Sequence, residues 1–280
     1  MKYTVTCYSF TQYVKAGKLT WKDCIAKAKE LGFDAIEFTN SPFENAEDPL
    51  AVAKELRAEA DRLGMVVSNL AVGADLLAED GVEKVCRYVD IAEILGAPTL
   101  RHDVAKGFKN PTFKGYDSVL PQLADACRKI TEYAAQKGIR TMTENHGFFS
   151  QDVLRVEKLI NTVSHPNFGA LVDLGNFMCA DEDPWKSVAV LAPYAKHVHA
   201  KDFFKKSGME IAPGAGWFQT RAGDYLRGTI IGHGEARIYQ SIQTLKKYGY
   251  DGFVTVEFEG MEDNLKGIQL GLDNLKRFIG

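Results

Sequence analysis

Residues 169–201 read GALVDLGNFMCADEDPWKSVAVLAPYAKHVHAK, and they contain the pattern from which the rest of the chain can be interpreted. A short apolar run, Gly169–Leu174, is followed by an amphipathic segment of helical length and then by a second short run, Lys196–Lys201. Short apolar runs that alternate with helix-length segments are typical of a parallel sheet covered by helices. Both runs also end in polar side chains. The stretch therefore predicts a strand–helix–strand unit with reactive groups at the carboxyl ends of its strands.

The same alternation continues over the whole chain and produces eight strand–helix pairs. The expected strands are Tyr3–Tyr8, Ala35–Thr39, Val66–Val72, Thr99–Asp103, Ile139–Asn145, Gly169–Leu174, Lys196–Lys201 and Phe253–Phe258. The expected helices lie at about Trp21–Leu31, Leu50–Leu63, Val82–Leu95, Val119–Lys137, Val153–Val163, Pro184–Leu191, Ile238–Tyr248 and Asn264–Phe278. Eight units favour a closed barrel, which uses about 250 residues as one domain. No GxGxxG follows the first strand, as a doubly wound dinucleotide-binding sheet would require. We predict the α/β class, with residues 1–280 forming a single (β/α)8 TIM-barrel domain.

Bulk composition limits the kind of partner. The net charge is −3, with 45% hydrophobic and 25% charged residues, as in ordinary globular proteins. Such a charge gives no attraction to phosphate backbones, so nucleic acid is not expected as a partner. No apolar stretch reaches the ~18 residues of a membrane span, and the first residues lack the apolar run of a signal peptide. The five cysteines are scattered with no CxxC pair, which indicates free thiols. We expect a cytoplasmic protein with no membrane partner.

One connection is much longer than an ordinary strand-to-helix loop. It covers about residues 203–231 and includes GAGWF at 214–218 and several aromatic and arginine side chains. Loops of this length in compact domains are usually functional or disordered, and the aromatic content argues against disorder. We expect a lid over the active site, with Trp217 contacting substrate, or a contact between the subunits of a homo-oligomer.

Polar residues at the ends of the fifth to eighth strands supply the candidate chemistry. Glu144, Asp173, His199 and Glu257 each occupy such a position. Alternation along each strand allows all four to point toward the barrel axis while their apolar neighbours face the helices. In barrels of this class, the active site lies at this end of the strands. Three carboxylates and one imidazole suit Mn²⁺, Mg²⁺ or Co²⁺, with Zn²⁺ also allowed. The pattern predicts a site for one divalent metal ion, with Mn²⁺ preferred.

These residues and their surroundings resemble the xylose isomerase-like barrel superfamily of sugar isomerases and epimerases. The resemblance covers the whole chain and rests on YTVTCYSF, GFDAIEF, TENHG, LVDLGN, HVHAKDF, IIGHGE and YGYDGFVTVEFEG. Members include ketose 3-epimerases, inosose isomerases and dehydratases, hydroxypyruvate isomerase and endonuclease IV. In this superfamily the Glu, Asp, His and Glu of these motifs hold one metal, which the resemblance transfers to Glu144, Asp173, His199 and Glu257.

The resemblance implies a metal-dependent isomerase or epimerase that acts on a keto-sugar, a sugar phosphate or an inositol-like polyol. The metal would stabilise an enediolate while Glu144 or Glu257, the expected catalytic residues, moves a proton next to the carbonyl. The alternative is a lyase or dehydratase that shares this first step and then expels a group from the β-carbon. Inosose dehydratases and C-glycoside deglycosidases are lyases of this kind.

Three positions depart from the pattern of the ketose 3-epimerases. Those enzymes usually have a His three residues after the Asp, where this chain has Asn176. They have an acidic residue where Ser150 stands, and an Arg where Lys205 stands. The departures put 3-epimerisation in doubt. His146, two residues beyond Glu144, is instead available as an extra base for elimination.

Further residues are expected to contact substrate. Tyr8 and His102 end the first and fourth strands and would line the pocket, together with Asn176 and His146. Lys201 shares the inward face of its strand with His199, and it either holds a substrate oxygen or forms an ion pair with Glu37 or Asp202.

Two further classes of function are less consistent with the sequence. A nuclease like endonuclease IV would need additional metal ligands on the early strands and a basic surface stripe. On those strands His102 alone offers such a ligand. A non-catalytic sugar-binding barrel would not need four intact metal ligands.

Overall fold

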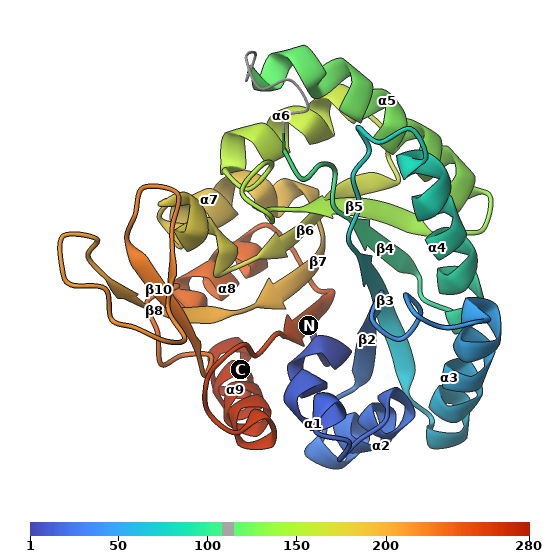
Figure 1. The fold of residues 1–280 in the computed structure, drawn as a ribbon, viewed down its shortest axis with the longest axis horizontal. Coiled ribbons are helices and arrows are strands. Elements are labelled where there is room, and N and C mark those ends of the chain that lie inside the picture. Colours follow the sequence, from blue (N-terminus) through green and yellow to red (C-terminus); the bar gives the residue numbers. More distant parts are fainter. Residues whose placement is uncertain (108–114) are drawn as a thin grey trace.

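The computed structural model describes residues 1–107 and 115–280. Its centre is a closed barrel of eight parallel strands in the order β1-β11-β7-β6-β5-β4-β3-β2 (Figure 1). The barrel strands are β1 (Lys2–Thr6), β2 (Ala35–Thr39), β3 (Val66–Val72), β4 (Thr99–His102), β5 (Arg140–Glu144), β6 (Phe168–Asp173), β7 (Ala195–Ala200) and β11 (Phe253–Val256). The predicted (β/α)8 TIM barrel is confirmed.

Helices surround the barrel and bury their apolar faces against it (Figure 1). They are α1 (Thr11–Lys15), α2 (Trp21–Leu31), α3 (Pro49–Leu63), α4 (Gly81–Leu95), α5 (Tyr116–Ala135), α6 (Val153–Val163), α7 (Pro184–Leu191), α8 (Ile238–Lys247) and α9 (Asn264–Ile279). Side chains cap the N-termini of several of these helices. Thr20 and Asp23 form a capping box at α2, and Asp48 accepts from two backbone amides at α3. No described helix is long and apolar enough to cross a membrane.

Two strands, β1 and β11, end two residues earlier than the sequence pattern predicts. The first expected strand ran to Tyr8, but β1 stops at Thr6 and Cys7–Phe10 form a 3₁₀ turn, η1. The last expected strand ran to Phe258, but β11 stops at Val256. In both places the chain leaves the ladder at the carboxyl end of the barrel. Residues that follow the strands there can turn over the barrel mouth.

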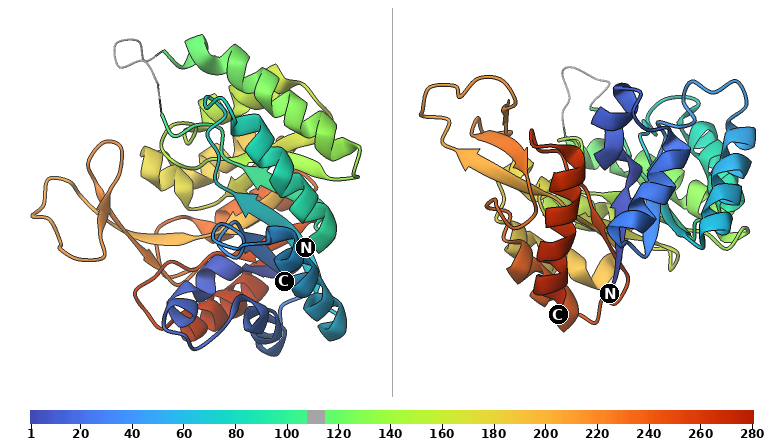
Figure 2. Two further views of the ribbon diagram at one scale, coloured as in Figure 1. Left: turned by 45° about the vertical axis from the view of Figure 1, so that its right-hand side comes forward. Right: turned by 90° about the horizontal axis from the view of Figure 1, so that it is seen from below.

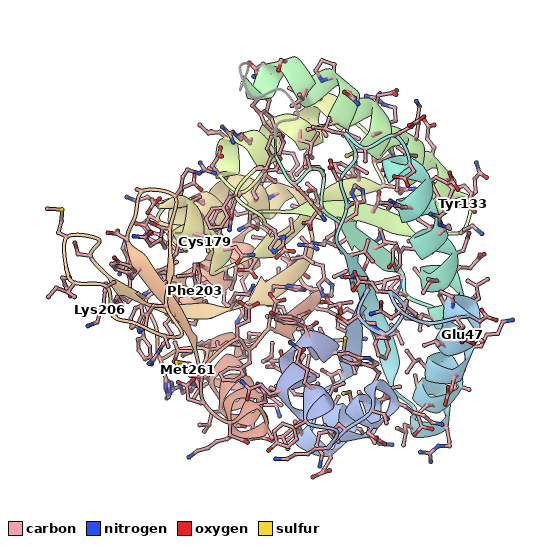
Figure 3. The ribbon with its side chains drawn as sticks, in the orientation of Figure 1. Glu47, Tyr133, Cys179, Phe203, Lys206 and Met261 are labelled. Carbon is pink, nitrogen blue, oxygen red and sulfur yellow. The ribbon has the colours of Figure 1, made fainter. Side chains whose placement is uncertain are left out.

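The expected long loop is a small antiparallel sheet. It contains β8 (Asp202–Lys206), β9 (Phe218–Gln219) and β10 (Tyr225–Thr229), in the order β8-β10-β9. We call residues 202–229 the arm. The arm extends away from the barrel, with Phe203 nearer the barrel and Lys206 farther out along β8 (Figures 2 and 3). In the right-hand view of Figure 2 the arm lies at the end of the barrel opposite the two chain termini, which is the end of the strand carboxyl termini.

Candidate metal centre

The four predicted ligands lie together at the carboxyl end of the barrel. Glu144 ends β5, Asp173 ends β6, His199 belongs to β7, and Glu257 follows β11 directly. One ligand atom from each lies within 4.8 Å of the others. Asp173, His199 and Glu144 are at most 4% exposed. The strand register therefore brings residues from four segments of the chain to one buried point.

Local backbone contacts hold Asp173 in place. Its Oδ1 accepts hydrogen bonds from the backbone amides of Gly175 and Asn176, both at 2.7 Å, because the chain turns immediately after β6. Asn145, which follows β5, also makes two side-chain hydrogen bonds to the backbone of Asp173. The turn requires glycine at 175, since a Cβ there would lie 2.4 Å from the carbonyl oxygen of Lys201. These contacts use one carboxylate oxygen and leave the other directed at the site.

The free oxygen of Asp173 is the best evidence that the site fits a cation. This buried Oδ2 has no hydrogen-bond partner among the described residues. Burial raises the pKa of Asp173, the Lys201 ammonium 3.8 Å from Oδ2 acts to lower it, and Glu144 and Glu257 raise it, with a net rise above the ordinary value. Crowded, buried carboxylates are destabilised unless positive charge lies among them. Three carboxylates and an imidazole are a donor set that a divalent metal ion would complete.

Two buried cations flank the ligands. The Lys201 ammonium lies 2.8 Å from Glu257 and 3.4 Å from Glu259. The Arg101 guanidinium lies 2.5 Å from Glu144 and 3.0 Å from Asp103. Burial alone would lower the pKa of Lys201, but Glu257 and Glu259 outweigh it and raise the pKa well above its ordinary value. Both cations therefore stay charged and paired with carboxylates.

One alternative for Lys201 was an ion pair with Glu37 or Asp202, and this alternative is wrong, because Lys201 pairs with Glu257 and Glu259. The Asp202 carboxylate instead accepts hydrogen bonds from the backbone amides of residues 203, 232, 234 and 236, because its side chain points away from the barrel axis and toward the turn before α8. Lys201 points inward with His199 and reaches Glu257 and Glu259.

A cavity of about 260 Å³ is lined by three of the four predicted ligands, Glu144, His199 and Glu257. Its wall includes three of the predicted substrate contacts, Tyr8, His146 and Lys201. Asn176, a fourth, lies beneath the wall, where it donates a hydrogen bond to Glu144 at 3.1 Å and accepts one from Lys201 at 3.3 Å. A larger cavity of about 620 Å³ lies between α4 and the loop before α3. In the described part of the chain no metal-competent cluster lines the larger cavity, so the chemistry favours the smaller cavity as the site.

His146 is held at the edge of this cavity by an acidic partner. Its Nδ1 lies 2.9 Å from Asp103 Oδ1, and its side chain is 44% exposed. Burial of the ring and the nearby Arg101 act to lower the pKa of His146, but the hydrogen bond and charge of Asp103 outweigh them and raise it. Among residues 1–107 and 115–280, no hydrogen-bond partner meets His146 Nε2. The pair resembles the acid-oriented histidines that move protons in enzymes.

Two predicted substrate contacts lie elsewhere. His102 faces away from the barrel axis, bonds the Asp103 carbonyl oxygen at 2.9 Å and packs on Phe168. The inward position on β4 belongs to Arg101. Trp217 lies on the arm, under the guanidinium of Arg227 at 5.5 Å, and does not line the cavity.

Sequence reasoning missed Arg101 and Asp103 as members of the site. The signal was present in the segment Thr99–Asp103. Leu100 must face the helices, so strand alternation directs Arg101 to the axis and His102 outward. Glu37 was considered only as a member of an ion pair. It lies directly beneath His199, with its Oε2 2.9 Å from His199 Nε2.

Comparisons with known proteins agree with this fold. An inosose dehydratase from Clostridium perfringens (strain 13 / Type A) is 23% identical over 255 residues, which span 86% of this chain and 82% of that protein. The probable 3-DHS dehydratase AsbF, involved in petrobactin synthesis in Bacillus anthracis, superposes with a TM-score of 0.75 at 19% identity and covers 99% of both chains. The D-psicose 3-epimerase of Clostridium cellulolyticum H10, solved with D-tagatose, gives 0.76 at 15% identity, covering 100% of this chain and 99% of that one.

At these identities the structural matches show a shared fold, while dehydratases and an epimerase both use it. A family model described as xylose isomerase-like TIM barrel matches residues 25–278. The match confirms the resemblance found in the sequence: the chain belongs to the xylose isomerase-like TIM barrel family.

Proposed function

We propose that the chain is a metal-dependent dehydratase of a polyhydroxylated ketone. In this reaction a proton leaves the carbon next to the carbonyl, and hydroxide leaves the β-carbon with a proton from an acid. The products are an unsaturated ketone and one water molecule. A divalent metal held by Glu144, Asp173, His199 and Glu257 would polarise the carbonyl and stabilise the negative charge that develops on its oxygen.

The observation that carries this proposal is His146 held by Asp103 beside Glu144. Elimination needs a base for the C–H bond and a separate acid for the departing hydroxide. Glu257 is the more accessible of the two ligand glutamates, with a side chain 13% exposed compared with 3% for Glu144. We assign the base to Glu257 and the acid to His146, which lies at the edge of the same cavity.

Charge in the cavity favours an uncharged substrate. Asp103, Glu144, Glu257 and Glu259 line the cavity together with two cations, Arg101 and Lys201. Both cations are already paired with carboxylates. Within residues 1–107 and 115–280, no lysine or arginine on this wall is left without a carboxylate partner to bind a phosphate. Hydroxyl and amide groups on the wall, at Thr39, Asn40 and Ser41, suit sugar or cyclitol hydroxyls.

The positions that distinguish ketose 3-epimerases give no support for epimerisation here. Asn176 bonds Glu144, and Ser150 bonds the Tyr116 hydroxyl away from the cavity. Lys205 pairs with Asp224 on the arm. Epimerisation is still the second candidate, because Glu144 and Glu257 approach the site from different strands and could serve the two faces of a substrate.

The test is incubation of the metal-loaded protein with an inosose or a neutral ketose in D₂O. We expect an unsaturated ketone, seen by near-ultraviolet absorbance, and deuterium next to the carbonyl in recovered substrate.

Glu257→Gln should slow both water release and deuterium exchange by about 10²–10⁴-fold. His146→Gln should lose water release but keep deuterium exchange. His165→Gln, at the other end of the barrel, is the control. Metal content is measured for each variant.

An epimer that forms with no unsaturated ketone, and equal losses in Glu144→Gln and Glu257→Gln, would identify an epimerase. Turnover with no solvent deuterium in substrate or product would contradict the exchange mechanism itself.

A further inference from the structure

A second buried polar cluster lies beneath the candidate metal centre. Glu37, His197 and His199 each place a ligand-type atom within 4.8 Å of the others, and all three are buried. Glu37 belongs to β2, on the far side of the barrel from β6, and is fully buried. Its Oε2 lies 2.9 Å from His199 Nε2 and 3.1 Å from His197 Nε2. His199 therefore belongs to both clusters.

The two nitrogens of His199 have different neighbours. Nε2 meets the Glu37 carboxylate, which can only accept a hydrogen bond, so Nε2 carries a hydrogen. Nδ1 faces the opposite way, 3.2 Å from Glu257 and 3.9 Å from Glu144. A metal ion among the carboxylates would need the Nδ1 lone pair.

We propose that Glu37 is a positioning residue that fixes His199 as its Nε2–H tautomer, with the Nδ1 lone pair directed at the metal centre. The proposal concerns assembly of the metal centre and does not depend on which reaction the metal supports. Hydrogen bonds from outside the ligand set commonly fix the tautomer and ring orientation of a metal-binding histidine, and losing them typically costs 10–100-fold in metal affinity.

Glu37 is itself held rigidly from the neighbouring strands. Asn69 of β3 donates from Nδ2 to Glu37 Oε2 at 3.1 Å. Thr99 of β4 donates to Asn69 Oδ1 at 2.8 Å, which sets the orientation of the Asn69 amide. The pairing of Glu37 with Asn69 follows a register shift between β2 and β3, immediately after Ile36. The Asn69 contact and those of the two histidines all fall on Oε2, and the buried Oε1 has no hydrogen-bond partner among the described residues.

A second metal ion held by Glu37, His197 and His199 is the competing explanation. The crowding of Oε2 argues against it, because Asn69 Nδ2, His197 Nε2 and His199 Nε2 all lie within 3.1 Å of this oxygen, and only Oε1 has no hydrogen-bond partner among the described residues. The short distances to both histidines are also those of direct hydrogen bonds.

The first experiment reads the tautomer in the unaltered protein. The ¹⁵N chemical shifts of labelled histidine, with Zn²⁺ bound, should show His199 protonated at Nε2 and metal-bound at Nδ1. Protonation at Nδ1, or no proton on either nitrogen, would overturn the proposal without any variant having to fold.

The second experiment measures Co²⁺ binding by calorimetry and by the visible spectrum of the bound ion. Glu37→Gln should weaken Co²⁺ binding 10–100-fold and change the spectrum, since a glutamine can pair with either tautomer. His197→Gln is the matched control. This variant removes an equally buried partner of the same Glu37 oxygen, and the His197 ring meets His199 only edge-on, with 5.8 Å between ring centroids.

We expect the control to keep the wild-type Co²⁺ affinity and spectrum. A folded Glu37→Gln protein with wild-type affinity, or equal losses in both variants, would overturn the proposal. Two equivalents of Co²⁺ on the wild-type chain, with one lost in Glu37→Gln, would establish the second metal site in its place.

Discussion

His102 is a buried, uncharged histidine at the end of β4, where its ring packs on Phe168. Burial lowers its pKa from 6.5 to about 4, against a smaller opposing effect of the hydrogen bond to the Asp103 carbonyl oxygen. In the unfolded chain His102 takes up a proton as pH falls below 6.5, while in the folded protein it does not. Stability due to this group is therefore complete above pH 6.5 and is lost as pH falls toward 4.

The first prediction follows from this difference. In metal-free protein, the free energy of unfolding should fall by on the order of 3 kcal/mol between pH 6.5 and 4 because of His102 alone. His102→Asn keeps an N–H donor for the Asp103 carbonyl oxygen and cannot titrate. Urea unfolding across this pH range should show a shallower dependence in the variant. Parallel curves for the two proteins would mean that His102 is already protonated in the folded state.

For single residues, the sequence predicts the four candidate metal ligands but places His102 wrongly in the cavity. Glu144, Asp173, His199 and Glu257 could be predicted because each ends a strand, and strand ends of one barrel must meet. His102 was expected in the cavity because it is a reactive residue at a strand end. The structure gives that place to Arg101. Which carboxylates Arg101 pairs with could not be predicted, since that depends on side-chain conformations at the ends of β4 and β5.

The arm is the element whose form differs most from the sequence prediction, because the expected loop is a three-stranded sheet. Its strands β8 and β10 pair over five residue positions, and Arg227 stacks over Phe204 and Trp217. Gly216, next to Trp217, packs so closely on Met261 that an added Cβ would lie 2.3 Å from its sulfur. Met261 follows Glu257 and Glu259 in the chain. The arm thus touches the loop that carries one wall of the site.

The second prediction tests the arm as a lid. Trp217→Ala should lower kcat/KM about tenfold, or about 1.4 kcal/mol of transition-state stabilisation, with little change in Tm. The reason is that Trp217 stacks under Arg227 and so steadies the neighbouring Gly216, which packs on Met261, while Trp217 itself lies outside the core. Ile211→Ala, at the 94% exposed tip, is the control and should change neither. A large fall in Tm with unchanged kinetics would make Trp217 a structural or subunit-interface residue.

Elements with strong periodicity could be predicted, and those without it could not. The helices around the barrel have long amphipathic repeats and were expected near their observed bounds. The arm was expected as a loop because β9 has two residues and its neighbours are separated by glycine-rich segments. Five-residue α1 is too short for a repeat to show.

For the molecule as a whole, eight strand–helix units predict barrel closure, and closure brings the fifth to eighth strand ends together. The count of units and the alternation along each strand therefore predict both the fold and the place of the site. Neither could show that two buried cations, Arg101 and Lys201, neutralise part of the carboxylate charge at the barrel mouth. This balance decides how strongly the centre attracts a metal ion and which substrates it admits.

The central claim is that Glu144, Asp173, His199 and Glu257 form one divalent metal site. The most direct test is the metal content of the protein after equilibrium dialysis against Mn²⁺, measured by elemental analysis. Wild-type protein should hold about one equivalent, and Asp173→Asn should hold almost none, because the substitution removes the charge of the buried carboxylate whose Oδ2 has no other hydrogen-bond partner in the described structure. Asp224→Asn, which alters only an ion pair on the arm, should match the wild type. Equal occupancy in Asp173→Asn and wild type, or a wild-type protein that takes up no Mn²⁺, Mg²⁺, Co²⁺ or Zn²⁺, would contradict the assigned site.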